Sequence, residues 1–277
     1  MENINKEKYP KVLVISNNPF SKTSNNGKTL ASFFKEFPPE NIAQLYFSSE
    51  LPSKDLYKNY YRISDTQVFK SLYSFNNAGS VIGLKNNEGN QEYKALSVRV
   101  NPNFMVKSNF FRLLRELMWQ CNKWKSDELV SWIVEFSPDI VFFCAGDAGF
   151  AYDIVSFVLD KTDSKLITYI TDDYVLPRRT ISLLWWIRRN IILKKMNKSI
   201  SHCNLFITIS EEMRMLYKEV FGKDSIIALN MTESMKIEGL KSNNLKNNTI
   251  NLIYAGGLNY KRYETLSLLA RAIKEYN

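Results

Sequence analysis

The fold is best predicted from the stretch Asn251-Leu-Ile-Tyr-Ala-Gly-Gly-Leu-Asn-Tyr-Lys-Arg-Tyr-Glu-Thr-Leu-Ser-Leu-Leu-Ala-Arg-Ala-Ile273. It predicts a buried strand, a glycine turn and an amphipathic helix, which is how a Rossmann-type layer begins. A lone unit of this kind cannot cover its own apolar surface, because a parallel strand needs neighbouring strands and helices. The residues before it already predict a complete α/β domain. We therefore expect one whole domain and the opening of a second, which breaks off at Asn277.

The first part of the chain predicts a doubly wound parallel sheet. Residues 11–16 (Lys-Val-Leu-Val-Ile-Ser) form a short apolar, β-branched run, which is typical of a central parallel strand. A polar turn over residues 17–26 precedes Gly27 and a helical pattern over residues 28–37, and residues 42–47 predict a second strand. This order favours an α/β fold. Further strands are predicted over residues 139–145, 166–171, 205–210 and 226–229.

Two stretches give weaker signals. Residues 51–100 contain turn clusters between weakly apolar pieces, so we interpret them as an insertion of mixed structure and assign no elements within it. Residues 109–124 predict a helix that carries Phe110, Leu113, Leu114, Leu117 and Trp124 on one side.

Composition narrows the class of protein. The chain has 277 residues, 45% of them hydrophobic, which is enough for a sizeable core. No apolar run approaches the roughly 20 residues that span a bilayer, and the polar N-terminus lacks the apolar core of a signal peptide. The isolated cysteines Cys121, Cys144 and Cys203 and the single histidine argue against disulfides, a metal site and a His-based triad. We expect a soluble, cytoplasmic protein that needs no metal.

Several segments resemble glycosyltransferase family 4 of the GT-B superfamily. They are Ser137-Pro-Asp-Ile-Val141, Tyr169-Ile-Thr-Asp-Asp-Tyr174, Phe206-Ile-Thr-Ile-Ser-Glu211 and the strand–glycine–helix pattern with Gly256, Gly257 and Arg262. The family's common form carries Arg directly after the first glycine, where this chain has Gly257, but a subset places it a few residues later, as Arg262 is placed.

The resemblance implies two Rossmann-like domains, each a parallel sheet with helices on both faces, that face each other across a cleft. Residues 1–234 would form the acceptor-side domain, residues 235–248 the linker, and residues 249–277 the first strand and helix of a truncated donor-side domain. The implied activity is transfer of a sugar from a nucleotide-sugar to a saccharide or lipid-linked acceptor, in cell-surface polysaccharide synthesis. No cofactor is implied besides the nucleotide-sugar substrate.

The implied donor-binding residues are Gly27, Gly256, Gly257, Lys261 and Arg262. A glycine lets the backbone approach a phosphate, and a guanidinium can hold a diphosphate with two hydrogen bonds and neutralise the leaving group. The alternatives are an ordinary turn glycine and a solvated, charged helix start. A P-loop is excluded, because that motif needs glycine where Lys22 stands.

The acidic pair Asp172-Asp173 follows a predicted strand, at the sheet edge where open α/β sheets bind ligands. By resemblance it would line the acceptor side of the cleft, where a carboxylate could assist as a general base. The alternative is that both aspartates cap a helix or a turn.

Residues 181–198 predict a basic helix or a helix pair, and the basic residues begin just before it. The residues expected to contact a membrane or an acceptor are Arg178, Arg179, Trp185, Trp186, Arg188, Arg189, Lys194 and Lys195. Cations interleaved with tryptophan suit an anionic lipid surface. The alternative is that the tryptophans pack in the core and the charges are solvated; nucleic acid is less favoured, because no recognised nucleic-acid motif is present.

The family's acidic donor-binding motif would lie beyond Asn277, so we expect this 277-residue chain alone to be inactive. The rival hypothesis is a non-catalytic half-enzyme that binds an acceptor, a membrane or a partner subunit. A third is a different two-domain Rossmann enzyme, such as an epimerase.

Overall fold

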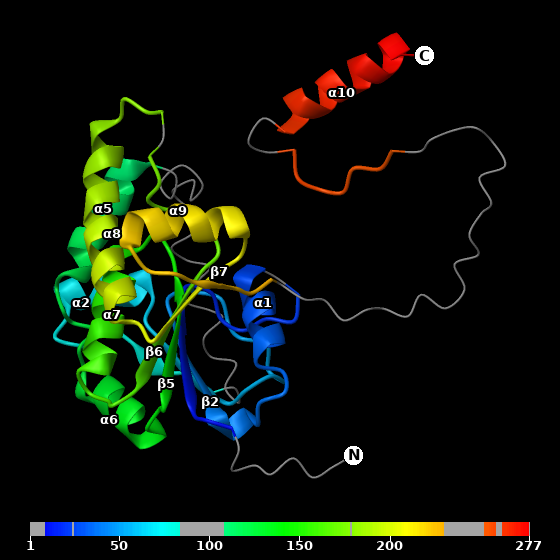
Figure 1. Ribbon diagram of the computed structural model, residues 1–277. Coiled ribbons are helices and arrows are strands. Elements are labelled where there is room, and N and C mark those ends of the chain that lie inside the picture. Colours follow the sequence, from blue (N-terminus) through cyan, green and yellow to red (C-terminus); the bar gives the residue numbers. More distant parts are fainter. Residues whose placement is uncertain are drawn as a thin grey trace, which may run out of the picture. The chain divides into compact units, whose positions relative to one another are not determined.

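The computed structural model describes residues 9–23, 25–83, 108–177, 179–229, 252–258 and 262–276 (Figure 1). The elements in this part of the chain are β1 (Val12–Ser16), α1 (Asn25–Phe33), the 3-10 helix η2 (Pro39–Asn41), β2 (Ile42–Tyr46), β3 (Asn59–Arg62), α2 (Asp65–Tyr73), β4 (Ser80–Val81), α5 (Asn109–Trp119), α6 (Asp127–Phe136), β5 (Ile140–Ala145), α7 (Gly149–Leu159), β6 (Lys165–Ile170), α8 (Leu183–His202), β7 (Leu205–Thr208), α9 (Glu211–Phe221), β8 (Ile226–Ile227) and α10 (Arg262–Tyr276). The chain divides into two units, Met1–Thr232 and Glu233–Asn277.

An eight-stranded sheet in the order β4-β3-β2-β1-β5-β6-β7-β8 forms the centre of the first unit. Neighbouring strands are parallel except at the edge, where β4 pairs antiparallel with β3. Val12 of β1 lies opposite Ile42 of β2 on one side and Ile140 of β5 on the other. The sheet therefore grows in both directions from β1, and the predicted Rossmann-like α/β fold is confirmed.

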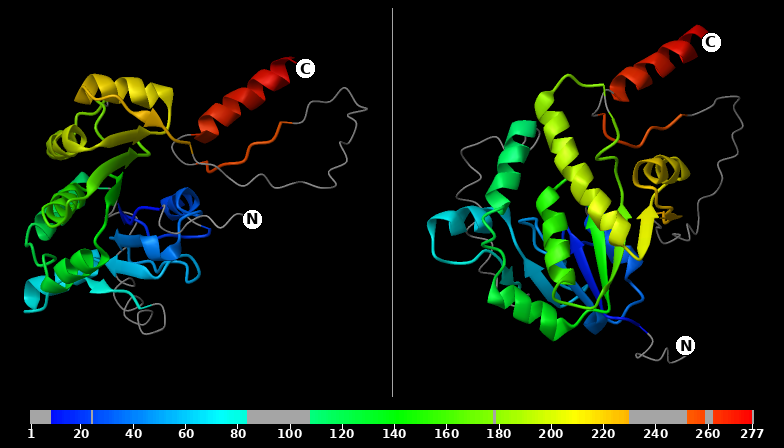
Figure 2. Two further views of the ribbon diagram at one scale, coloured as in Figure 1. Left: turned by 60° about the horizontal axis from the view of Figure 1, so that its bottom comes forward. Right: turned by 60° about the vertical axis from the view of Figure 1, so that its left-hand side comes forward.

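Strand β1 lies inside the sheet, between β2 and β5, and every one of its residues is buried. Its side chains alternate between two apolar clusters, with Leu13 and Ile15 in one and Val12 and Val14 in the other. Figure 2 shows α1 in blue on one face of the sheet, and the green and yellow helices on the other. The strand is covered on both faces, which explains its continuous apolar run.

Serine side chains begin several helices. Ser126 accepts a hydrogen bond from Leu129 N at 3.1 Å at the start of α6, and Ser210 accepts one from Met213 N at 3.2 Å at the start of α9. Such caps satisfy amide groups that have no partner inside the helix. Ser210 is followed by Glu211 and Glu212, a sequence pattern that predicts a helix start, and the structure confirms it. Helix α8 is one continuous helix, not a pair, since no proline or glycine interrupts residues 183–202.

The stretch interpreted as an insertion contributes three elements of the sheet layer. β3 and β4 extend the sheet, and α2 follows β3 directly. The signal was weak because β3 is only four residues long and carries Tyr60 and Tyr61 in place of aliphatic residues. Both tyrosines are fully buried, so the strand lies inside the core despite its polar hydroxyl groups.

Helix α5 is shorter than predicted, and only part of its predicted apolar side faces the core. It ends at Trp119, before Asn122 takes a φ of 57° that no helix can continue through. Of the predicted apolar side, Phe110, Leu114 and Leu117 are 56%, 51% and 62% exposed, whereas Leu113 is half-buried and Trp124, beyond the end of the helix, is buried.

The second unit contains α10, as predicted, but no strand within residues 252–258. The strand prediction is wrong for these residues because a parallel strand requires hydrogen-bonded neighbours, and the described residues of this unit include none. None of the residues in α10 is buried. The predicted linker, residues 235–248, lies outside the described residues.

Candidate functional site

The strand order places a candidate site at the carboxyl ends of β1, β5 and β6. The sheet grows in opposite directions from β1, so the connections after β1 and β5 lead to helices on opposite faces. In open α/β sheets, ligands bind outside the carboxyl ends of the strands at such a switch point. The residues at this edge are Asn17, Asp147 and Asp172, each one or two positions beyond the end of its strand.

A buried glutamine holds the loop that follows β1. The Gln44 amide nitrogen donates to Ser16 Oγ at 2.9 Å and to the Asn18 carbonyl at 3.1 Å, and its oxygen accepts from Phe20 N at 2.8 Å. Gln44 is fully buried, and these bonds satisfy its amide group. The sequence analysis missed this residue, although a lone glutamine in an apolar strand could have signalled it.

Gly27 lies inside α1, because the helix begins at Asn25 and not at Lys28 as predicted. A side-chain carbon at Gly27 would lie 2.0 Å from the carbonyl oxygen of Pro19. Glycine is therefore required for close packing between the helix and the loop after β1. The space that a side chain at Gly27 would need is taken by the Pro19 carbonyl.

Asp147, directly beyond β5, binds two arginines. Its Oδ2 accepts hydrogen bonds from Arg112 of α5 and Arg188 of α8, and Arg188 also donates to the Asp147 carbonyl oxygen at 3.0 Å. The side chain of Arg188 is only 8% exposed, whereas those of Arg112 and Asp147 are about one third exposed. This carboxylate therefore neutralises a buried cation.

A second carboxylate occupies the amino end of α7. Glu116 Oε1 accepts a hydrogen bond from Gly149 N at 2.7 Å, and the glutamate is buried. Burial raises the pKa of Glu116, although the Gly149 hydrogen bond and the nearby Lys195 act in the opposite direction. A helix amino end attracts anions, and here the anion comes from the protein itself.

The aspartates predicted to be catalytic lie in different environments. The Asp173 Oδ1 accepts hydrogen bonds from the backbone nitrogens of Val175 at 3.1 Å and Leu176 at 2.9 Å, so Asp173 stabilises a turn. Asp172 is exposed, and its carbonyl oxygen accepts from the Tyr217 hydroxyl at 3.4 Å. Of the two, Asp172 is the residue that is exposed at the carboxyl edge of the sheet.

The predicted basic segment does not form one continuous charged surface. Arg179 and Lys194 are exposed, whereas Arg188 is buried and Lys195 donates to Asp153 at 2.7 Å. Arg189 donates to the Val175 carbonyl at 2.6 Å. Arg178 lies outside the described residues.

The two tryptophans of this segment are half-buried and in contact. The rings of Trp185 and Trp186 meet edge to face at 4.8 Å between centroids, and the Trp186 indole nitrogen donates to the Thr180 carbonyl at 3.2 Å. Through these contacts the two tryptophans hold the first turn of α8 to the preceding segment at Thr180.

The donor-side residues of the second unit are exposed where they are described. Arg262 is the first residue of α10, and Lys261 lies outside the described residues. A side chain at Gly256 would meet the Tyr254 hydroxyl at 2.8 Å, whereas Gly257 has open space around it.

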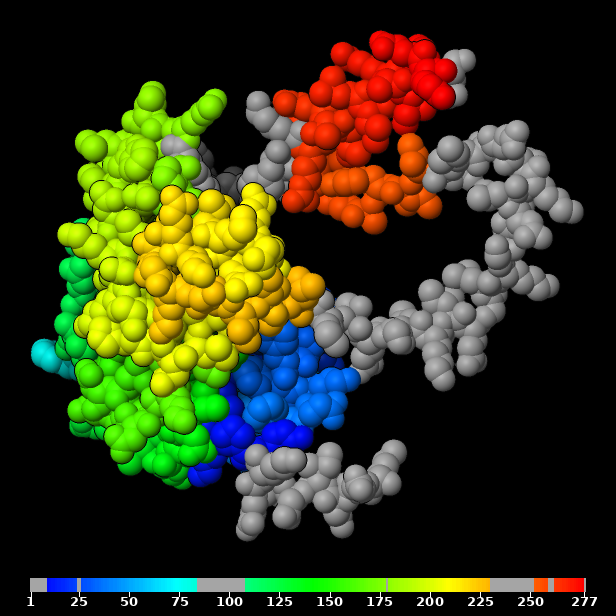
Figure 3. Space-filling model, in the orientation of Figure 1, coloured from blue at the N-terminus to red at the C-terminus, as the bar shows by residue number. Residues whose placement is uncertain are grey.

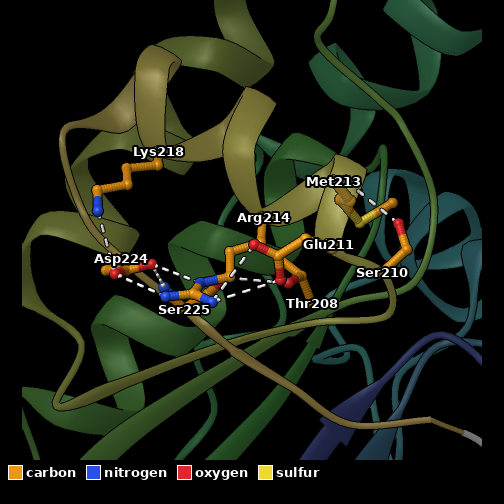
Figure 4. Close-up of polar contacts among 8 residues, drawn as sticks. All are labelled: Thr208, Ser210, Glu211, Met213, Arg214, Lys218, Asp224 and Ser225. Atoms are coloured by element: carbon orange, nitrogen blue, oxygen red, sulfur yellow. Dashed lines mark hydrogen bonds and ion pairs between the residues drawn. The ribbon is translucent and has the colours of Figure 1, made fainter.

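A cluster of charges on α9 has a structural role (Figure 4). Arg214 donates to both carboxylate oxygens of Asp224, at 2.8 and 3.0 Å, and Lys218 donates to Asp224 at 3.2 Å. These hydrogen bonds hold the pKa of Asp224 below its usual range. Behind them, the hydroxyls of Thr208 and Ser225 bond at 2.9 Å. The cluster secures the turn into β8, and the Asp224 carboxylate is held by Arg214 and Lys218.

A groove of about 620 Å³ opens at the amino ends of β5 and β6. One of its carboxylates, Asp139, accepts a hydrogen bond from Lys11 N at 2.7 Å. The groove lies at the edge of the sheet opposite to the one where open α/β sheets bind ligands, so we place the candidate site at the carboxyl edge.

No protein-family model and no curated protein matches the sequence. Within the described ranges, no three His, Cys, Asp or Glu side chains are grouped to hold a metal ion, and no helix is long and apolar enough to cross a membrane.

Proposed function

We propose that the first unit is the acceptor-side domain of a glycosyltransferase, which transfers a sugar from a nucleotide-sugar to a saccharide or lipid-linked acceptor in cell-surface polysaccharide synthesis. The observation that carries the proposal is the exposed Asp172 carboxylate at the carboxyl edge of a sheet with a switch point. Sheets of this kind serve many functions, so the support comes from this residue and from the resemblance in segment order.

In this proposal, Asp172 accepts the proton of an acceptor hydroxyl, and Asp173 keeps the loop in place. Lys261 and Arg262 bind the diphosphate of the donor and neutralise the charge that develops on the leaving nucleotide. The remaining catalysis comes from holding donor and acceptor in reactive geometry. No metal takes part, and peripheral association with the inner face of the membrane would bring the protein to lipid-linked acceptors.

The test measures sugar transfer by the native protein purified from its own cells, with panels of nucleotide-sugars and of saccharide and lipid-linked acceptors. We expect transfer, and we expect Asp172→Asn to lower kcat by about 10²- to 10⁴-fold, as loss of a general base does, without lowering Tm. Asp173→Ala is the matched control: it removes the acceptor of the Val175 and Leu176 amides, so it should lower Tm, while kcat should fall less than with Asp172→Asn. Absence of binding, hydrolysis and transfer with every nucleotide-sugar would refute the proposal.

A second candidate is a non-catalytic domain that binds an acceptor, a membrane or a partner. Two observations favour it, because the Pro19 carbonyl fills the space beside Gly27 and Glu116 occupies the amino end of α7. The amino end of α7 is thus occupied by a side chain of the protein itself, and the close approach at Gly27 is made by the protein's own backbone. Binding of an acceptor by the native protein, with no transfer from any donor, would identify this candidate.

A further inference from the structure

The start of α8 exposes a group of aliphatic side chains, here called the apolar apex. They are Ile181, Leu183, Leu184 and Ile187, which are 105%, 71%, 38% and 43% exposed. Figure 1 shows the chain that leads into α8 projecting at the upper end of the first unit, and Figure 3 shows its yellow-green atoms on the surface there. Exposed apolar residues that gather in one place, rather than singly, indicate a binding surface.

The apolar apex cannot turn into the core, because another side of α8 already packs there. Its inward stripe is Arg188, Ile192, Met196 and Ile200, which are all buried at four-residue intervals. Ser182 caps the helix by accepting from Trp185 N, and Trp186 bonds to the Thr180 carbonyl. These contacts hold the apex rigidly outward.

The outward side of α8 changes from apolar to basic along its length. Beyond Ile187 it presents Asn190, Lys194 and Lys198, all exposed, and the helix contains no acidic residue. Lys194 lies about 10 Å along the axis from Ile187, at 1.5 Å per residue. An apolar end followed by cations at this distance matches the depth profile of a membrane interface, from acyl chains to phosphate headgroups.

We propose that the apolar apex inserts into the acyl boundary of a lipid surface, while Arg179, Lys194 and Lys198 contact its phosphate headgroups. A lipid surface fits better than a protein partner, because the exposed side of α8 changes from apolar to basic along the helix axis. A protein partner would instead favour an apolar patch enclosed by polar residues. Arg188, Arg189 and Lys195 already have partners inside the protein, so the apolar residues supply most of the binding.

This inference deepens the proposed function and rests on it for its purpose, because the apex would place Asp172 near lipid-linked acceptors. Lipid binding is measured without any sugar donor, however, so either proposal can fail while the other holds.

The test is cosedimentation of the full chain with vesicles of phosphatidylcholine alone and of phosphatidylcholine with 30% phosphatidylglycerol (about one third anionic lipid). We expect binding to both, stronger with the anionic lipid. The double variant Ile181→Ser/Leu183→Ser should bind about 100-fold more weakly to both, at roughly tenfold per aliphatic side chain. Lys194→Gln should weaken binding by about fivefold, and only to the anionic vesicles.

The matched control removes equally exposed apolar side chains elsewhere. Phe75→Ser/Val134→Ser changes residues that are 103% and 56% exposed, and it should bind vesicles like the wild type. All variants should keep the wild-type Tm, because none of the changed side chains is buried. The proposal is overturned if the wild type binds neither vesicle, if the apex variant binds like the control, or if light scattering shows that the apex joins two copies of the chain.

Discussion

The ion pair of Arg188 and Asp147 gives a stability prediction that tests the geometry of the sheet edge. Asp147→Asn keeps the size of the side chain but removes the charge that neutralises Arg188, whose side chain is 8% exposed. Removing one partner of a fully buried pair costs about 3–5 kcal/mol. Water reaches the outer side of Asp147 and Arg112, so we expect a smaller loss of about 2 kcal/mol in the free energy of unfolding.

Two further variants separate this effect from a general loss of charge. Asp153→Asn removes the partner of Lys195, in a pair that is 48% and 25% exposed, and should cost less than about 1 kcal/mol. Arg188→Met leaves Asp147 bound to Arg112 and fills most of the same volume. The double variant Asp147→Asn/Arg188→Met should have a free energy of unfolding about 1 kcal/mol or more above that of Asp147→Asn alone, because it leaves no unpaired cation buried.

The free energies come from urea unfolding at constant pH, followed by tryptophan fluorescence. The slopes with urea should agree among the variants, so that differences report stability and not a changed unfolded state. The reasoning fails if Asp147→Asn costs no more than Asp153→Asn. It fails equally if adding Arg188→Met to Asp147→Asn brings no recovery.

Two more predictions concern the loops beside the site. Burial raises the pKa of Glu116, so the folded protein holds this proton more tightly than the unfolded chain, and stability falls as pH rises above about 4.3 toward the folded pKa. Glu116→Gln should remove this loss while keeping the Gly149 hydrogen bond. In urea unfolding, the difference in the free energy of unfolding between this variant and the wild type should therefore grow with pH. A difference that stays constant with pH would contradict the prediction. Gly27→Ala should cost about 3 kcal/mol or more, since its side chain would meet the Pro19 carbonyl at 2.0 Å, and Gly146→Ala, with nothing within 4 Å, should have little effect on Tm.

Much of the sheet could be predicted because its signals are local. Residues 12–15 are apolar in every position, which only a strand covered on both faces requires, and the same holds for residues 140–145. The start of α9 could likewise be predicted, because its signal, Ser210 followed by two glutamates, spans only a few residues. The tyrosine-rich β3 escaped detection because its burial depends on neighbours that are distant in sequence.

The side chains at the sheet edge were harder to predict because their partners come from other elements. Glu116 stood on an amphipathic helix and was not singled out, although it takes the amino end of α7. Gln44 was likewise passed over within its strand. In both cases a polar residue inside an apolar pattern is a visible signal that a partner exists, but sequence alone does not name the partner.

The basic segment shows most clearly what one-dimensional charge patterns leave open. No acidic residue lies between Arg178 and Lys198, and this predicted an exposed cationic surface. The anions that meet these cations stand 40 or so positions away, as Asp147 meets Arg188 and Asp153 meets Lys195. Parallel sheets place a helix beside the strand connections before it, so such long-range pairs are to be expected in this fold. Charges in a helix that packs on a parallel sheet should therefore be assigned to solvent only after the preceding strand–helix connection has been searched for partners.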